Sequence, residues 1–194
     1  MKLTNKLLIV SAMVLAVGSV QQVSAQQMPM GKGTMMNDGQ TAVVVLSPTE
    51  GNNVTGVVYF TQTDKGVHVS GMVENLTPGK HGFHVHEFGD CSDSAGKTAG
   101  GHFNPTHKKH GDRLSADRHI GDLGNIVADK DGRATIDFVD TVISLGGPNS
   151  IIGRGIIVHG GADDLVSQPS GNAGPRVACG TIGVAKSKAP DMMK

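Results

Sequence analysis

The chain has 194 residues, with 17 basic and 17 acidic side chains, so its formal net charge is zero. That balance, together with the lack of any Lys/Arg-rich run, excludes nucleic-acid binding by bulk charge. The 28 glycines and the 3% aromatic content argue against a helical bundle and suit a fold with many tight turns.

The first 25 residues have the order of parts typical of a secretory signal peptide. Lys2 and Lys6 precede a largely apolar stretch, residues 7–20, and residues 23–25 (Val-Ser-Ala) offer a cleavage site. A membrane anchor is the alternative, but the stretch is shorter than the ~20 residues that cross a bilayer and no second stretch follows. We therefore expect a periplasmic or secreted protein with no membrane insertion after cleavage. Cleavage removes two lysines and no acid, so the exported chain becomes slightly negative.

The rest of the chain divides into three parts. Residues 26–40 are polar and rich in Met and Gly, and we expect a disordered lead-in there. Residues 41–187 have the length of one domain. Residues 188–194 are expected to form a flexible C-terminal tail.

Eight short segments rich in Val, Ile, Thr or Phe predict β-strands within this domain. Turns containing Gly, Pro, Asn or Asp separate them, and no window shows a sustained apolar period of 3.6 residues. The predicted fold class is therefore all-β, a sandwich or a barrel with no long helix. The segments are residues 41–47, 54–62, 66–75, 82–88, 124–130, 133–140, 155–160 and 177–185.

Two of the connections between the predicted strands are long, residues 89–123 and 161–176. Both carry few apolar side chains, so something other than hydrophobic burial has to order them. Cys91 and Cys179 form an even pair in an exported chain, which favours a disulfide over two free buried thiols. The first connection also holds four of the nine histidines. A metal is therefore the second candidate for ordering these loops.

The histidines supply two sets of candidate metal ligands that share one member. His84 and His86 lie two apart on a predicted strand and so point the same way, although such pairs also occur on wet surfaces. Four imidazoles suit tetragonal Cu(II), and this set comprises His84, His86, His102 and His159. Three imidazoles and a carboxylate suit tetrahedral zinc, and this set comprises His102, His110, His119 and Asp122. Because an imidazole has two ring nitrogens, His102 can serve both sets.

Several runs, in this order along the chain, resemble the copper/zinc superoxide dismutases over about residues 41–185. No single run is specific, but their joint order is. The runs are Gly-Phe-His-Val-His-Glu-Phe-Gly-Asp (82–90), His-Phe-Asn-Pro (102–105), Arg-His-Ile-Gly-Asp-Leu-Gly-Asn (118–125), Ile-Ile-Gly-Arg (151–154) and Gly-Asn-Ala-Gly-Pro-Arg-Val-Ala-Cys-Gly (171–180). The signal peptide and the early cysteine are typical of the secreted bacterial members. The segment from Asp164 to Gly171 is shorter than in the eukaryotic members.

The resemblance implies an eight-stranded antiparallel Greek-key β-barrel, an immunoglobulin-like sandwich with two long functional loops. It also implies a superoxide dismutase that converts superoxide to oxygen and hydrogen peroxide by Cu(II)/Cu(I) cycling. One copper ion and one zinc ion per chain would occupy the two histidine sets. His102 would bridge the metals, leave copper on reduction and carry a proton to the product. Such an enzyme would serve antioxidant defence outside the cytoplasm.

The resemblance also implies roles for four residues outside the two ligand sets. Arg176 would guide the substrate anion to copper, although it is open to a second interpretation as a structural residue that bonds loop carbonyls. Asp163 would orient one histidine of each set by accepting a hydrogen bond from it. Cys91 and Cys179 would form the disulfide that pins the first long loop to the barrel.

Three alternatives stay open at this point. The first is a copper-binding or storage protein on the same fold, and the second is an interaction module stapled by zinc alone, which leaves His84, His86 and His159 without a role. The third concerns the lead-in, whose methionines could capture Cu(I) or form an oxidisable tail.

A homodimer is also expected, but its geometry is open because Ile-Ile-Gly-Arg (151–154) is typical of the eukaryotic dimers while other features are bacterial.

Overall fold

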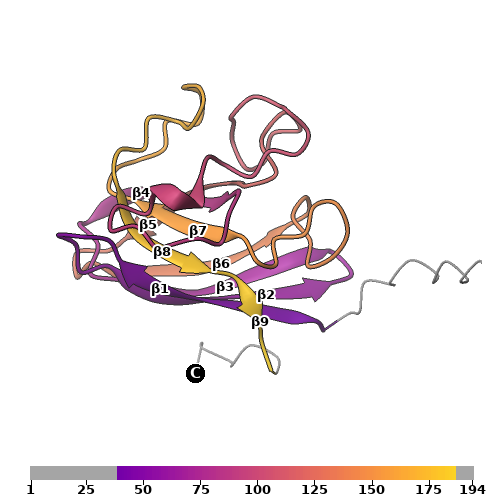
Figure 1. Ribbon diagram of the computed structural model, residues 1–194, viewed down its shortest axis with the longest axis horizontal. Helices are drawn as coiled ribbons and strands as arrows, with labels where there is room; N and C mark the ends of the chain where they lie inside the picture. The colour runs from indigo at the N-terminus through magenta and orange to yellow at the C-terminus, as the bar shows by residue number, and fades with distance from the viewer. Residues whose placement is uncertain (1–38, 187–194) are drawn as a thin grey trace, which may run out of the picture. The chain divides into compact units, whose positions relative to one another are not determined.

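The computed structural model describes residues 39–186 and is drawn as a ribbon in Figure 1. The predicted signal peptide, almost all of the predicted lead-in and the C-terminal tail lie outside the described residues. No helix long and apolar enough to cross a membrane is found between residues 39 and 186. The described part is β-structure joined by loops, with a single turn of 3-10 helix, η1 (Lys97–Ala99).

The strands follow the predicted segments closely. They are β1 (Thr41–Pro48), β2 (Thr55–Thr63), β3 (Gly66–Glu74), β4 (Gly79–His86), β5 (Asp122–Ala128), β6 (Ala134–Asp140), β7 (Gly155–His159), β8 (Arg176–Thr181) and β9 (Gly183–Val184). The eighth predicted segment is divided, because Ile182 separates β8 from the two-residue strand β9. Ile182 instead bonds the loop before β7, accepting from Gly153 N–H at 2.8 Å and donating to the Arg154 carbonyl at 2.9 Å.

Hydrogen bonding joins the strands in the order β5-β4-β7-β8-β1-β2-β3-β6, with β9 paired to β1. Every pair is antiparallel, and the jumps from β4 to β7 and from β8 to β1 produce the Greek-key connections. The two ends of this order, β5 and β6, also contact each other, so the sheet closes nearly completely. The predicted all-β, eight-stranded antiparallel barrel is confirmed.

The core follows from the alternation of side chains along each strand. In β1, Val44 and Leu46 are 0% and 2% exposed while the intervening Val45 is 64% exposed. Strand β7 departs from this rule, since all five of its residues are buried. A strand buried on both faces needs a covering layer on each side. Figure 1 shows the loops after β4 and after β7 lying together beyond the part of the barrel that contains β4, β5 and β7.

Candidate metal site

Strand β4 divides its side chains between the barrel core and the layer beneath the loops. Phe83 and Val85 are 0% exposed and belong to the hydrophobic core. His84 and His86 alternate with them and therefore point to the other face, where they are 0% and 1% exposed. Strand β7 pairs with β4 and ends at His159, which lies on the same side.

The four histidines of the predicted copper set come together, and one ring nitrogen of each is free. One nitrogen of each lies within 4.8 Å of the others. These atoms are His84 Nδ1, His86 Nε2, His102 Nε2 and His159 Nε2, and each is buried with no hydrogen-bond partner among the described residues. Buried polar atoms are almost always satisfied. Four convergent unsatisfied imidazole nitrogens therefore fit a metal with a preference for nitrogen ligands.

Each of these rings is oriented by a contact to its second nitrogen, which fixes where the free nitrogen points. The contacts are His84 Nε2 to Asp163 Oδ2 at 2.7 Å, His86 Nδ1 to the Gly100 carbonyl at 2.9 Å, His102 Nδ1 to Asp122 Oδ1 at 2.7 Å and His159 Nδ1 to the Gly174 carbonyl at 3.0 Å. Two of the acceptors are backbone carbonyls of the long loops. The loops therefore take part in shaping the site.

Burial keeps these imidazoles neutral, which is the form that binds a metal. Loss of hydration lowers the pKa of His84 to about 3 and that of His159 to about 4. It also lowers the pKa of His86 and of His102. A ring whose pKa lies below neutrality carries no proton on its free nitrogen at pH 7, so no proton has to be displaced from these four free nitrogens.

The predicted zinc set gathers around one oxygen atom. Asp122 Oδ1 lies 2.7 Å from His102 Nδ1, 3.0 Å from His110 Nδ1 and 3.1 Å from His119 Nδ1. The Nδ1 atoms of His102 and His119 are 3.4 Å apart. Ligands of tetrahedral zinc, with bonds of about 2.0–2.1 Å, are separated by roughly 3.3 Å. The four separations are close to this value or somewhat shorter, so the three nitrogens and one oxygen fit a zinc site.

Contacts between acids and histidines shift the pKa values of His110 and Asp122 in opposite directions. Burial alone would lower the pKa of His110, but the hydrogen bonds with Asp122 and Asp163 raise it to about 9. Burial would likewise raise the pKa of Asp122, but three imidazoles hold it well below the usual range. Without metal, His110 therefore carries a proton between two carboxylates. Zinc binding has to displace that proton.

Asp163 joins the two sets. Its Oδ2 lies 2.7 Å from His84 Nε2 and its Oδ1 lies 2.9 Å from His110 Nε2, with all three side chains fully buried. The backbone of Asp163 is itself held by Asn125 of β5, which donates to its carbonyl at 2.9 Å and accepts from its N–H at 2.8 Å. This places Asp163 where the resemblance expects a carboxylate that orients one histidine of each metal set.

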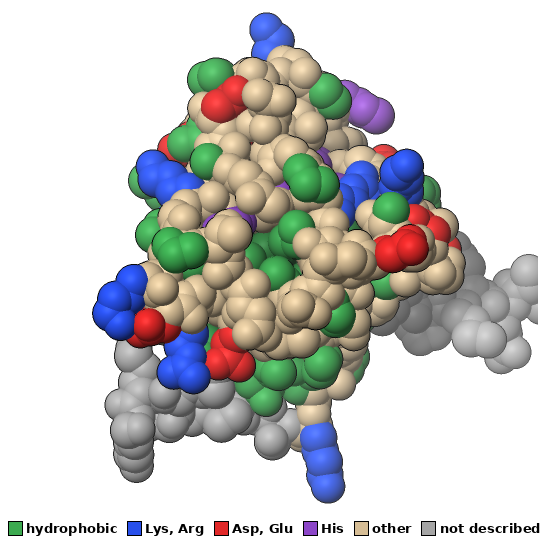
Figure 2. Space-filling view, turned by 90° about the vertical axis from the view of Figure 1, so that its left-hand side faces the viewer, with side chains coloured by type: hydrophobic (Ala, Val, Ile, Leu, Met, Phe, Trp, Pro, Cys, Tyr) green, Lys and Arg blue, Asp and Glu red, His purple; other side chains and the backbone are tan. Residues whose placement is uncertain are grey.

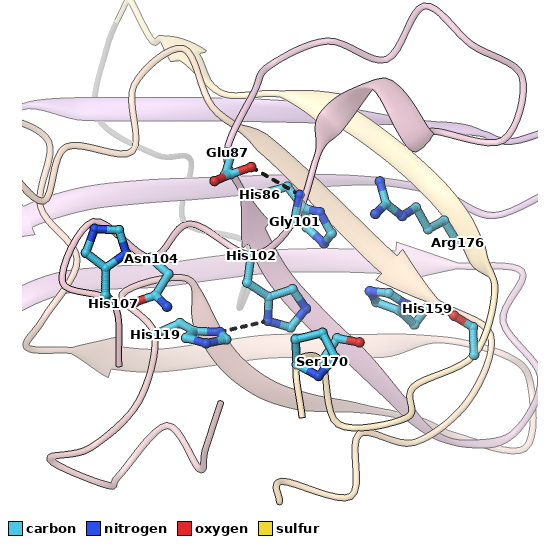
Figure 3. Close-up of a pocket in the computed structure, with 12 residues that line it drawn as sticks. His86, Glu87, Gly101, His102, Asn104, His107, His119, His159, Ser170 and Arg176 are labelled. Atoms are coloured by element: carbon cyan, nitrogen blue, oxygen red, sulfur yellow. Dashed lines mark hydrogen bonds between the residues drawn. The ribbon is translucent and has the colours of Figure 1, made fainter. Parts of the chain in front are cut away.

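A cavity of about 490 Å³ opens above the copper set, lined by His86, His102, His159 and Arg176 among others. Figure 3 shows Arg176 and His159 on one side of this cavity and His119 and His107 on the other, with His102 between them. Arg176 donates to the carbonyls of Gly96 at 2.5 Å and Gly100 at 2.7 Å. Arg176 therefore bonds loop carbonyls and also lines the cavity, and its role in guiding the anion stays a prediction.

The predicted disulfide is present. Cys91 and Cys179 are bonded across 88 residues of sequence, and Cys179 packs with Ala99 and Ile157 in a small second cluster. The bond attaches the start of the first long loop to β8. The same loop supplies the Gly100 carbonyl that orients His86 and accepts from Arg176. The disulfide therefore supports the wall of the cavity.

One important residue has no sequence signal of its own. Arg118 is 2% exposed, and its Nη2 lies 2.7 Å from Asp140 Oδ2 at the end of β6. Its Nη1 donates to three carbonyls of the loop, and the shortest bond, 2.7 Å, is to that of Asp122. A buried Arg with these partners shapes the turn that carries His119 and Asp122. Only its place beside His119 in the sequence could have suggested this role.

The family profile named copper/zinc superoxide dismutase (SODC) matches residues 54–182. The chain belongs to the copper/zinc superoxide dismutase family. An extracellular superoxide dismutase (Cu-Zn) of Brugia pahangi is 47% identical over 154 residues, covering 75% of this chain and 76% of that one. A superoxide dismutase (Cu-Zn) of Onchocerca volvulus is 48% identical over 154 residues, covering 74% and 95% respectively. A crystal structure of the clock protein EA4 matches with a TM-score of 0.71 and 47% identity, covering 80% of this chain and 100% of that one.

These matches confirm the predicted family, the enzyme class and the two metal cofactors of a copper/zinc superoxide dismutase. The two relatives are nematode proteins, and one of them is named extracellular. They give no specific support to a bacterial type.

Proposed function

We propose that this chain dismutes superoxide, converting two superoxide anions and two protons to oxygen and hydrogen peroxide, with the two histidine sets as its metal ligands. The main support is the convergence of four buried, unpartnered ring nitrogens beside a second set that shares His102. Superoxide consumption by protein of known metal content tests the proposal. Copper-binding or storage without catalysis is less well supported, because such a protein needs neither Arg176 nor an open cavity beside the metal.

The residues of this chain have separable tasks in that reaction. Bound copper supplies one-electron chemistry and bound zinc supplies a fixed positive charge without redox chemistry. Asp163 and the carbonyls of Gly100 and Gly174 hold the histidine rings in place. His102 Nε2 lies at the cavity, and when it is free of metal it can hold one proton for the departing peroxide. Its Nδ1 meanwhile stays with Asp122 and the zinc set.

The substrate is expected to be captured by a local positive field, because superoxide carries one negative charge and the exported chain is slightly negative. On the face drawn in Figure 2, basic and acidic side chains are scattered, with no extended patch of either sign. Arg176 is the cation that lines the cavity. We therefore propose that Arg176 supplies much of the attraction beside the copper set.

Charge reversal separates steering by Arg176 from its structural bonds. Arg176→Ala and Arg176→Glu both remove the bonds to Gly96 and Gly100, but only Glu repels the anion. We expect Arg176→Glu to slow superoxide consumption by about 10-fold or more, and by more than Arg176→Ala. The attraction in the parent should weaken as the Debye length falls from about 10 Å at 0.1 M salt to about 3 Å at 1 M, and the reversal should flatten or invert this dependence. Pulse radiolysis across ionic strengths measures both effects.

If Arg176→Glu keeps both metals and shows the parent's rate and the parent's salt dependence, Arg176 does not steer the substrate. If Ala and Glu slow the reaction equally and leave the salt dependence unchanged, the two carbonyl bonds account for its role.

We propose export as the setting of this activity, with antioxidant defence outside the cytoplasm as the task. The predicted signal peptide supports export, and a disulfide persists in oxidising compartments. Periplasmic location and a bacterial type remain predictions from the signal peptide and from the position of Cys91.

We also propose a homodimer that covers two exposed apolar side chains. Phe88 is 58% exposed and Val184 is 68% exposed. Residues near them in the sequence are joined by the hydrogen bond that the Gly89 carbonyl accepts from Thr181 Oγ1. A second copy of this chain would cover both side chains. Sedimentation equilibrium at micromolar concentration is expected to give two chains per particle, and Phe88→Glu to give one; a parent that stays monomeric contradicts the proposal.

A further inference from the structure

One residue of the second long loop, residues 161–176, holds a member of the zinc set by its backbone. Gln168 Oε1 accepts from the His110 N–H at 2.8 Å, and Gln168 Nε2 donates to the His110 carbonyl at 3.0 Å. A single side-chain amide thus satisfies both backbone polar groups of one residue, as a neighbouring strand would. Gln168 belongs to neither ligand set, and the sequence gives no signal for this contact.

His110 depends on such support because no regular structure holds its backbone. Residues 107–112 lie in neither strand nor helix. The ring is placed by its contacts to Asp122 Oδ1 at Nδ1, 3.0 Å, and to Asp163 Oδ1 at Nε2, 2.9 Å. Gln168 is an exposed residue, but the His110 that it reaches is only 4% exposed. Ring and backbone of His110 are therefore both attached to the second loop.

The second loop can act as a support because it is braced on both sides of Gln168. Asn125 holds the backbone of Asp163 at one end. At the other end, Gly171 N–H donates to the Ser167 carbonyl at 2.7 Å. Gly171 has φ +67°, and a Cβ added there would lie 1.8 Å from Asp163 Oδ1 and 2.6 Å from His110 Nε2. The loop thus packs closely against the Asp163 carboxylate and the His110 ring, with no space for a side chain at Gly171.

We propose that Gln168 is a positioning residue of the zinc set, which holds the His110 backbone and thereby slows the loss of zinc. The neighbouring Pro169 and Ser170 line the cavity above the copper set, so the same contact ties the zinc set to the cavity wall. The inference rests on the proposed function only in taking zinc as the ion of this set. It concerns retention of zinc and the order of the loop, not the chemistry at copper.

Two variants and one control separate the bonds of Gln168 from its bulk. Gln168→Ala removes both bonds. Gln168→Glu keeps the size and the acceptor, but its ionised carboxylate has no proton for the His110 carbonyl. Val166→Ala is the control, because Val166 lies in the same loop with a side chain 72% exposed to solvent. Zinc release from the copper- and zinc-loaded protein into a chromogenic chelator is the main measurement, with hydrogen exchange of residues 108–112 as the second.

We expect Gln168→Ala to release zinc about 10-fold faster than the parent, since loss of a contact that orients a metal ligand costs at least that much in metal affinity. Gln168→Glu keeps the acceptor for the His110 N–H, so it should release zinc faster than the parent and no faster than Gln168→Ala, and both variants should exchange amide hydrogens faster in residues 108–112. Val166→Ala should match the parent. Copper should stay at one ion per chain throughout.

Parent-like zinc release by both Gln168 variants overturns the proposal. Parent-like release by Gln168→Glu alone also overturns it, because bulk rather than the paired bonds would then retain zinc. If Gln168→Ala folds poorly, Gln168→Glu still decides between these outcomes. Superoxide consumption by the parent is measured on the same sample. An inactive parent with both metals bound contradicts the proposed function and leaves the zinc-release comparison intact.

Discussion

Replacing Asp122 by alanine is expected to empty the zinc set while copper stays bound. Asp122 Oδ1 is the atom around which His102, His110 and His119 gather, and its Oδ2 accepts from the N–H groups of Gly111 at 3.0 Å and His119 at 2.9 Å. The substitution removes one of the four proposed ligands and the anchor of the turn. Changing a contact that only orients a ligand costs 10–100-fold in metal affinity, so losing this ligand should weaken zinc binding by more than about 100-fold.

Competition with a zinc chelator measures this loss, and elemental analysis checks that copper stays at one ion per chain. The copper set keeps all four of its nitrogens, although His102 Nδ1 loses its 2.7 Å contact. The Cu(II) spectrum should therefore change, and turnover should become slower and more sensitive to pH. Asp129→Ala is a suitable control, because Asp129 is an exposed acid in the turn after β5. Parent-like zinc affinity in Asp122→Ala would place zinc elsewhere.

Breaking the disulfide is expected to cost the fold on the order of 4 kcal/mol. Cys91 and Cys179 close 88 residues of chain, and in the chain-entropy model a loop of about that length restricts the unfolded state by about that free energy. This free energy is an upper estimate, because real unfolded chains keep some structure. The Cys91→Ser, Cys179→Ser double variant should also weaken copper binding, since the Gly100 carbonyl that orients His86 lies in the loop that the bond attaches.

Urea unfolding of the metal-free parent and the double variant measures the loss of stability without any contribution from bound metal. A difference below about 1 kcal/mol would show that the bond adds little to the fold. Alkylation of both cysteines in the native, metal-loaded parent would show that the bond is absent in solution.

The sequence was sufficient for the parts of this structure that depend on local pattern. Segments rich in Val, Ile, Thr or Phe between Gly, Pro, Asn or Asp turns predicted the strands, and the spacing of His84 and His86 placed both rings on one face of β4. The loops were recognisable as ordered by something other than burial, because their apolar content is thin. The roles proposed for Asp163 and Arg176 came from the resemblance to a known family rather than from their own surroundings.

Contacts between residues far apart in the sequence lay beyond sequence reasoning. Gln168 meets His110 across 58 positions of sequence, and Arg118 meets Asp140 across 22. The type of residue does not predict such a partner, since a Gln in a polar loop is ordinarily solvated. The end of β8 was missed for a similar reason: Ile182 turns to bond Gly153 and Arg154, and this bond belongs to the folded arrangement rather than to the strand pattern.

The central claim is that one chain holds a redox metal on four histidines beside a second metal that shares His102. Metal content and superoxide consumption, measured on one sample of the exported protein, test it most directly. We predict one copper and one zinc per chain, with activity that disappears when copper is removed and returns when copper is restored. Full activity in a sample that contains zinc and no copper would contradict the claim.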